Sequence, residues 1–167
     1  MHAHILVPLV AFPLLLSQPA IAADADCAVW KTEPWEVEGG TALTAYICDT
    51  TSETEIPPTL YLQCSAPGLL ALNYDDSVSG PPDGEVEYSA IYRFSVGAAH
   101  VDAALAFQQM DAVMTTELQA DAPLIKLLRR DGAVTVSPTT GDGPVITFPL
   151  DGASQALATL QASCRKS

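Results

Sequence analysis

Basic residues are scarce in this chain. Seven Lys and Arg stand against 20 Asp and Glu, which gives a formal net charge of −13 at pH 7. Binding to a nucleic-acid backbone needs a basic surface, so this balance argues against nucleic acid as a partner. The simplest interpretation of the acidity is solubility. A cationic partner, such as a basic protein or a metal ion, is the alternative.

Histidine and the common catalytic motifs are also scarce. His100 is the only histidine beyond the first 22 residues, and its neighbours indicate a surface or strand-end position. A catalytic serine needs a base nearby, yet the chain has no G-x-S-x-G elbow. It has no C-x-x-C metal motif and no P-loop either. We therefore expect no enzymatic activity, no metal and no cofactor.

Long apolar runs are confined to the N-terminus. Ile5 to Leu16 has the length of a signal-peptide core, about 7–15 residues. Ala20-Ile21-Ala22 follows with the small-x-small pattern that signal peptidase needs. Prolines interrupt the run, which argues against a transmembrane anchor of about 20 residues. The sequence predicts a cleaved signal peptide at residues 1–22 and one domain at 23–167, periplasmic or secreted, without a stable membrane anchor.

Four cysteines follow the leader: Cys27, Cys48, Cys64 and Cys164. An even count beyond a signal peptide predicts disulfides. Cys64 shares a strand face with Leu60 and Leu62, and Cys164 lies on the apolar stripe of a C-terminal helix. Both thiols therefore point into apolar surroundings, which predicts Cys64–Cys164 and, by elimination, Cys27–Cys48.

Alternating apolar residues predict an antiparallel sheet. Helical spacing predicts two helices that cover it. The expected class is α+β, a β-sandwich or curled sheet. The expected strands are 43–48, 59–65, 69–74, 85–96 and 145–150, with a hairpin of 124–128 and 134–136, loops at 76–84 and 97–106, and helices at 108–119 and 153–164.

Carboxylates and aromatic residues are the remaining candidates for a site. Asp75, Asp76 and Glu85 could do acid–base work on a glycan, as paired carboxylates do in glycosidases. However, Asp75 and Asp76 open a Gly/Pro-rich segment, where Asp is a common turn residue. Trp30 and Trp35 could stack on a ligand or cover one end of the core. Met110 and Met114, at helical spacing, could indicate a flexible binding groove or a soft metal site, but methionine at this spacing is more often core.

The order of these segments resembles a known family. Thr59 to Cys64, then Leu70-Ala71-Leu72, and the ending Phe148-Pro149-Leu150-Asp151-Gly152 with a terminal Cys164, are similar to the exported TagO/VasI-like proteins associated with type VI secretion loci. The last third also resembles the invasion-associated locus B family. The resemblance implies a periplasmic β-sandwich-like domain with Cys64 bonded to Cys164. It implies an accessory or binding role and transfers no catalytic residue.

These observations favour an exported, non-enzymatic binding or accessory protein of the cell envelope. An inhibitor of a basic envelope hydrolase such as lysozyme is a second hypothesis, based on acidity and on the segment Asp75 to Gly84. A glycan hydrolase that uses Asp75, Asp76 or Glu85 is the third. The partner is expected to be an envelope protein or another basic protein, and the sequence identifies no binding surface.

Overall fold

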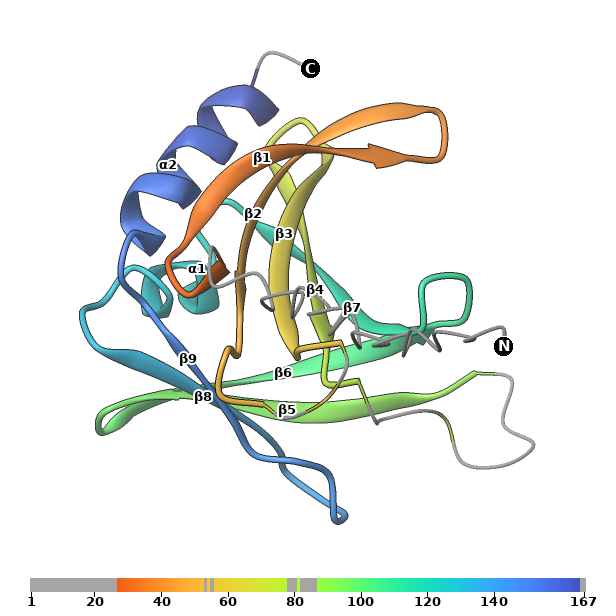
Figure 1. Cartoon of the computed structure of the whole chain (residues 1–167), viewed down its shortest axis with the longest axis vertical. Coiled ribbons are helices and arrows are strands. Elements are labelled where there is room, and N and C mark those ends of the chain that lie inside the picture. The colour runs from red at the N-terminus through yellow and green to blue at the C-terminus, as the bar shows by residue number, and fades with distance from the viewer. Residues whose placement is uncertain (1–26, 53, 55, 78–80, 82–86, 166–167) are drawn as a thin grey trace, which may run out of the picture.

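A single curled antiparallel sheet forms most of the molecule. The computed structural model describes residues 27–52, 54, 56–77, 81 and 87–165, so the predicted leader, Glu85 and most of the predicted loop 76–84 lie outside the described residues. The sheet has nine strands in the order β1-β2-β3-β4-β7-β6-β5-β8-β9, and Figure 1 shows helices beside it. The fold is therefore a sheet-rich α+β fold.

The bounds of the elements follow the chain. The strands are β1 (Lys31–Val37), β2 (Gly40–Cys48), β3 (Thr59–Ala66), β4 (Leu69–Asp75), β5 (Ser89–Val96), β6 (Ala99–Gln108), β7 (Val113–Gln119), β8 (Ala133–Pro138) and β9 (Ile146–Pro149). The helices are α1 (Pro123–Leu127) and α2 (Ala153–Cys164). No helix within the described residues has the length and apolar character needed to cross a bilayer.

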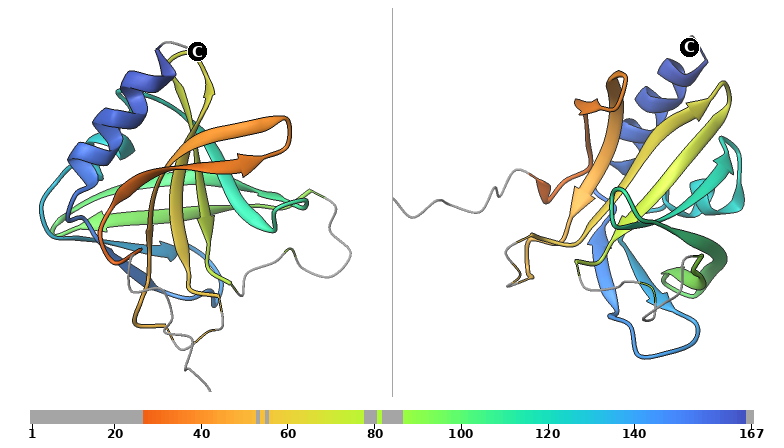
Figure 2. Two further views of the ribbon diagram at one scale, coloured as in Figure 1. Left: turned by 45° about the horizontal axis from the view of Figure 1, so that its top comes forward. Right: turned by 90° about the vertical axis from the view of Figure 1, so that its right-hand side faces the viewer.

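The curl of the sheet encloses the core. Strands β2, β3 and β4 run across the direction of β5 and β6, as Figures 1 and 2 show. Tyr74 of β4 meets Tyr92 of β5 with ring centroids 5.3 Å apart, and Phe148 of β9 at 6.4 Å, both edge-to-face. Tilted and edge-on contacts of this kind are the favourable ones for aromatic rings. The alternation predicted for β5 is confirmed, because Tyr92, Phe94 and Val96 are buried.

Trp30 joins the two edge strands of the sheet. Its backbone N–H donates to the carbonyl of Asp151 at 2.9 Å, and its indole Nε1 donates to the carbonyl of Pro149, also at 2.9 Å. The side chain is only 4% exposed. Gly152 makes this approach possible, since a Cβ there would lie 2.7 Å from the Trp30 carbonyl oxygen. The segment before β1 is thereby held against the end of β9.

Helix α2 covers one face of the first three strands. Its buried stripe consists of Ala153, Ala156, Leu157, Leu160 and Cys164, as the helical spacing predicts. Cys64 of β3 forms a disulfide with Cys164, with Cα atoms 5.5 Å apart. The bridge fastens the end of α2 to the sheet.

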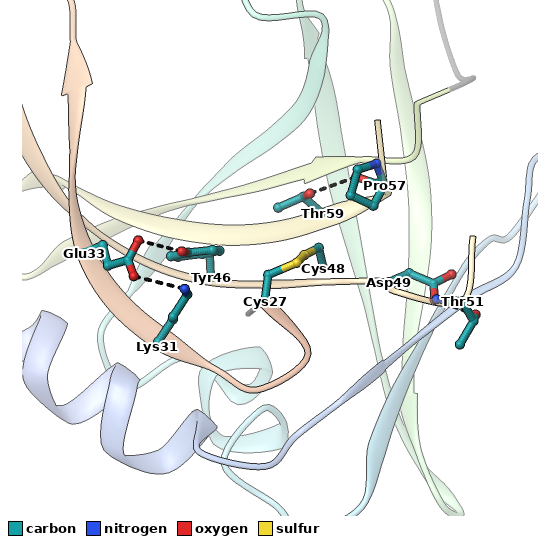
Figure 3. Close-up of a disulfide and its surroundings, with 9 residues drawn as sticks. All are labelled: Cys27, Lys31, Glu33, Tyr46, Cys48, Asp49, Thr51, Pro57 and Thr59. Atoms are coloured by element: carbon teal, nitrogen blue, oxygen red, sulfur yellow. Dashed lines mark hydrogen bonds and ion pairs between the residues drawn. A yellow bond between two sulfur atoms is a disulfide. The ribbon is translucent and has the colours of Figure 1, made fainter. Parts of the chain in front are cut away.

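The second disulfide joins Cys27 to Cys48, with Cα atoms 5.4 Å apart. Figure 3 shows it connecting the segment before β1 to the end of β2. Both predicted pairings are therefore present, and no cysteine of the described residues is free.

The predicted helix at 108–119 is wrong. Residues 113–119 form strand β7, which pairs with β4 through the register Tyr74↔Met114 to Leu69↔Gln119. Met114 and Leu118 are four residues apart, a spacing that puts two side chains on one face of a helix and equally of a strand. The β-branched Val113, Thr115 and Thr116 favour the strand. Met110, expected in the core, is 81% exposed in the turn before β7, whereas Met114 is buried as expected.

Two further segments differ from the predictions. Residues 124–128, expected as one arm of a hairpin, belong to α1 and the residue after it, and only 134–136 form a strand. Pro123 begins this helix, where its missing N–H costs no hydrogen bond. The expected loop 97–106 is mostly β6, whose many alanines have a weak strand preference and hid the alternation.

Candidate binding groove

Three aromatic side chains gather on the face of the sheet opposite α2. Tyr46 of β2 lies directly across from Tyr61 of β3. Ala45 and Ile47 beside Tyr46, and Leu60 and Leu62 beside Tyr61, are fully buried on the other face. The alternation of side chains therefore turns both tyrosines away from the core. The Trp35 ring lies 4.8 Å from the Tyr46 ring and 5.3 Å from the Tyr61 ring, tilted against each. β1, β2 and β3 thus build one aromatic platform.

A cation and a carboxylate complete one end of this platform. Glu33 accepts a hydrogen bond from the Tyr46 hydroxyl at 2.6 Å and forms an ion pair of 3.0 Å with the Lys31 ammonium. The same ammonium lies 5.2 Å from the centroid of the Tyr46 ring, within the range of a cation–π interaction. Figure 3 shows these three side chains together.

A hydrogen bond between buried Thr44 and half-buried Gln63 fixes the middle of the platform. Gln63 of β3 donates from Nε2 to the hydroxyl of Thr44 at 2.8 Å, and Thr44 has no exposed surface. Buried polar groups that are hydrogen-bonded in this way hold their side chains in one geometry. The Gln63 side chain is therefore positioned beside Tyr61.

The other end of the platform opens into a groove of about 620 Å³. Its walls are the end of the β1–β2 hairpin, from Trp35 to Glu38, and the β6–β7 turn, from Gln108 to Asp111; Tyr61 and Gln63 line it from β3. Figure 1 shows that hairpin extending away from the body of the sheet. The volume lies within the range of small-molecule sites, about 300–1,000 Å³. We call this space the aromatic groove.

The aromatic groove is acidic. Glu36, Glu38 and Asp111 line it, and none of the described residues that line it is basic. Asp111 accepts a hydrogen bond from the Gln108 amide at 2.9 Å, which holds its carboxylate in the β6–β7 turn. Met110 of the same turn presents an 81% exposed thioether chain. The groove therefore offers an aromatic face, a flexible apolar side chain and negative charge.

The pKa of Tyr61 reflects this electrostatic environment. Burial, followed by the negative charges of Asp111 and Asp75, raises the pKa of Tyr61 to about 12. A free tyrosine titrates at about 10. Each of these causes favours the neutral phenol over the phenolate.

We expect the phenolate absorbance difference between wild type and Tyr61→Phe to show a midpoint near pH 12, because that is the pKa of Tyr61. The raised pKa of Tyr61 also contributes to the free energy of unfolding. This contribution is fully present below pH 10, the approximate pKa of tyrosine in the unfolded chain, and is lost as pH rises from about 10 to the folded pKa. In Asp111→Asn the midpoint moves toward 10. An unchanged midpoint in that variant would contradict the electrostatic effect of Asp111 on Tyr61.

Of the carboxylates proposed for glycan chemistry, Asp75 lies in a turn and Asp76 is buried. Asp75 accepts a hydrogen bond from the backbone N–H of Ser77 at 2.7 Å, the arrangement of an Asx turn. Asp76 is only 4% exposed. Glu87 is exposed, and Glu85 lies outside the described residues. Among the residues that the structure describes, no three His, Cys, Asp or Glu cluster as metal ligands would.

His100 is exposed near the start of β6, opposite Ser95. Asp102, two residues further on, forms two hydrogen bonds of 2.8 Å to the Arg93 guanidinium. This pairing lowers the pKa of Asp102. The carboxylate beside His100 is thus engaged by arginine on an open sheet face.

The two tryptophans have separate roles. Trp30 covers the end of the core, and Trp35 lies in the aromatic groove. The sequence analysis missed Tyr46, Tyr61 and Asp111 as site residues. A signal was present for the tyrosines, since each lies between two aliphatic residues in a strand and therefore faces away from the buried side. No local pattern pointed to Asp111, because the turn that holds it was expected to be helix.

Comparisons with known proteins give a likeness of fold. No protein-family model matches the chain, and no curated protein does. Among solved structures, it is similar to the crystal structure of invasion associated protein B from Bartonella henselae, with a TM-score of 0.56 and 15% identity, covering 83% of this chain and 95% of that one. The expected resemblance to the invasion-associated locus B family is confirmed for the fold. These comparisons do not show a likeness to TagO/VasI-like proteins.

Proposed function

We propose that this chain is an exported, non-enzymatic binding or accessory protein of the cell envelope, and that the aromatic groove is its binding site. The groove carries the proposal, because it gathers half-buried aromatic side chains with exposed thioether and carboxylate side chains from three separate segments. Ligand sites are usually concave, as this groove is.

The covalent structure supports export. Two disulfides are typical of proteins that fold in an oxidising compartment. The signal-peptide pattern at residues 1–22 points to the same compartment. The association with type VI secretion that the sequence resemblance implies is part of this proposal, and secretion-apparatus genes beside the gene for this chain would support it.

Inhibition of a basic envelope hydrolase such as lysozyme is the second candidate function. The observation that favours it is the acidic lining of the aromatic groove, which complements a basic surface. An inhibitor slows lysozyme at near-stoichiometric amounts, whereas an accessory protein leaves its rate unchanged.

The binding site is tested with a photo-cross-linking amino acid at Met110, in cells that produce the full chain with its leader. Met110 is 81% exposed at the groove, so we expect a discrete adduct with an envelope component on illumination.

Export itself is a separate prediction. The exported protein should begin at Ala23 and show free thiols only after reduction.

The matched control places the same amino acid at Ile91. Ile91 is 50% exposed on β5 and does not line the groove. Adducts of equal yield at both positions, or none at Met110, would contradict a binding site in the groove.

A further inference from the structure

The aromatic groove has the chemistry of a receptor for a cationic side chain. We propose that it binds a lysine or arginine side chain of a basic polypeptide segment, with the charged group between the Tyr61 and Trp35 rings and the carboxylates of Asp111 and Glu38. This inference rests on the proposed function and names the ligand class of the same site.

The chain contains an internal example of this arrangement. At the other end of the platform, the Lys31 ammonium lies 5.2 Å from the Tyr46 ring centroid and 3.0 Å from the Glu33 carboxylate. The groove repeats the composition with Trp35, Tyr61 and acidic neighbours. None of its described lining residues supplies the cation. In the groove, a cation from another molecule would therefore take the position that Lys31 has beside Tyr46.

Charge complementarity selects a cation over an uncharged ligand. Three acidic residues line the groove, and the net charge of the chain is −13. A field of this sign attracts a basic partner and accelerates its encounter at low ionic strength. The raised pKa of Tyr61 has a negative neighbour, Asp111, among its causes, which agrees with a site that favours positive charge.

The apolar part of the groove matches the stem of a basic side chain. Lysine and arginine bury their methylene stems against apolar surface while their charged ends stay with polar partners. The exposed Met110 is flexible and polarizable enough to pack along such a stem. A glycan would use the aromatic faces but would gain less from the carboxylates.

The probe is fluorescein-labelled hexalysine, and fluorescence anisotropy measures its binding to the signal-cleaved protein with both disulfides intact. We expect saturable binding that weakens as salt rises. Asp111→Asn should weaken it about three- to tenfold because an ion pair is lost, and Met110→Ala should weaken it by about the same factor because apolar packing along the stem is lost. Trp35→Ala should abolish it.

Asp142→Asn is the charge-matched control. Asp142 is an exposed carboxylate in the turn between β8 and β9 and does not line the groove, so its neutralisation should change the affinity less than about twofold. Met110 is exposed in a turn, so Met110→Ala keeps the test decisive even where Trp35→Ala fails to fold.

Three results would overturn the inference. The first is that Asp111→Asn and Asp142→Asn weaken binding equally, which would show that only diffuse charge acts. The second is that chitotriose displaces hexalysine or binds in its place. The third is that hexalysine does not bind at all. The two proposals remain separable. If the Met110 adduct forms in cells but hexalysine does not bind, the site stands and its ligand class is wrong. If Met110 gives no adduct, the site itself is wrong.

Discussion

The double variant Cys64→Ala/Cys164→Ala is expected to lose up to about 4.7 kcal/mol of folding free energy in the chain-entropy description. This bridge spans a sequence separation of 100. Its removal releases a long loop in the unfolded chain and also frees the end of α2 from β3. A single domain is stable by only about 5–15 kcal/mol. The variant should therefore unfold near physiological temperature.

The second bridge provides the comparison. Cys27–Cys48 spans a separation of 21, so Cys27→Ala/Cys48→Ala should cost less, roughly 3 kcal/mol. Urea unfolding of both double variants measures the difference, and a slope m equal to that of wild type would show that the unfolded states are comparable. A larger loss for the shorter bridge would contradict the view that Cys64–Cys164 is the main covalent restraint.

Trp30→Ala is expected to destabilise the protein by about 3–5 kcal/mol, the usual cost of removing a large buried aromatic side chain. Trp30 is 4% exposed, and its indole donates to the Pro149 carbonyl. The substitution opens a cavity and leaves that carbonyl without the indole donor. Because Trp30 immediately precedes β1, we also expect the two sheet edges to separate, which thermal and urea unfolding would register.

Trp30→Phe separates the hydrogen bond from the packing. Phenylalanine keeps most of the apolar volume and removes the indole N–H. The loss should therefore be smaller, about 1–3 kcal/mol for the hydrogen bond to a part-buried acceptor and for the smaller ring. Hydrogen exchange at β1 and β9 would show where protection falls. If Trp30→Ala left the stability unchanged, Trp30 would not join the edges of the sheet.

Trp30 and the Cys27–Cys48 bridge also position the strand that lines the binding groove. Trp35 lies on β1, five positions after Trp30 in the sequence, and the Cys27–Cys48 bridge holds the chain just before that strand. The core-side contacts thus position the strand that presents Trp35 on the opposite face. A loosened β1 would alter the groove without any change to the residues that line it.

Segments that bury one face carry a clear signal in the sequence, whereas a segment whose spacing suits two structures does not. The alternation in β5 and the apolar stripe of α2 were readable, because each segment buries one face and leaves the other in water. The faces of Cys64 and Cys164, and therefore their pairing, could be predicted for the same reason. The strand within residues 108–119 could not be predicted, since a spacing of four suits a helix and a strand equally. Residues 113–119 form a strand because they pair with the free side of β4.

The sequence by itself determined the acidic charge, the disulfide framework and the sheet-rich class, because composition and local periodicity express them directly. Only the tertiary structure decided the groove. Trp35, Tyr61 and Asp111 come from segments that are distant along the chain, and they meet because β1 and β3 flank β2 while the β6–β7 turn lies near the β1–β2 hairpin. Such proximity depends on strand order and on the curl of the sheet, and no short stretch of residues encodes either.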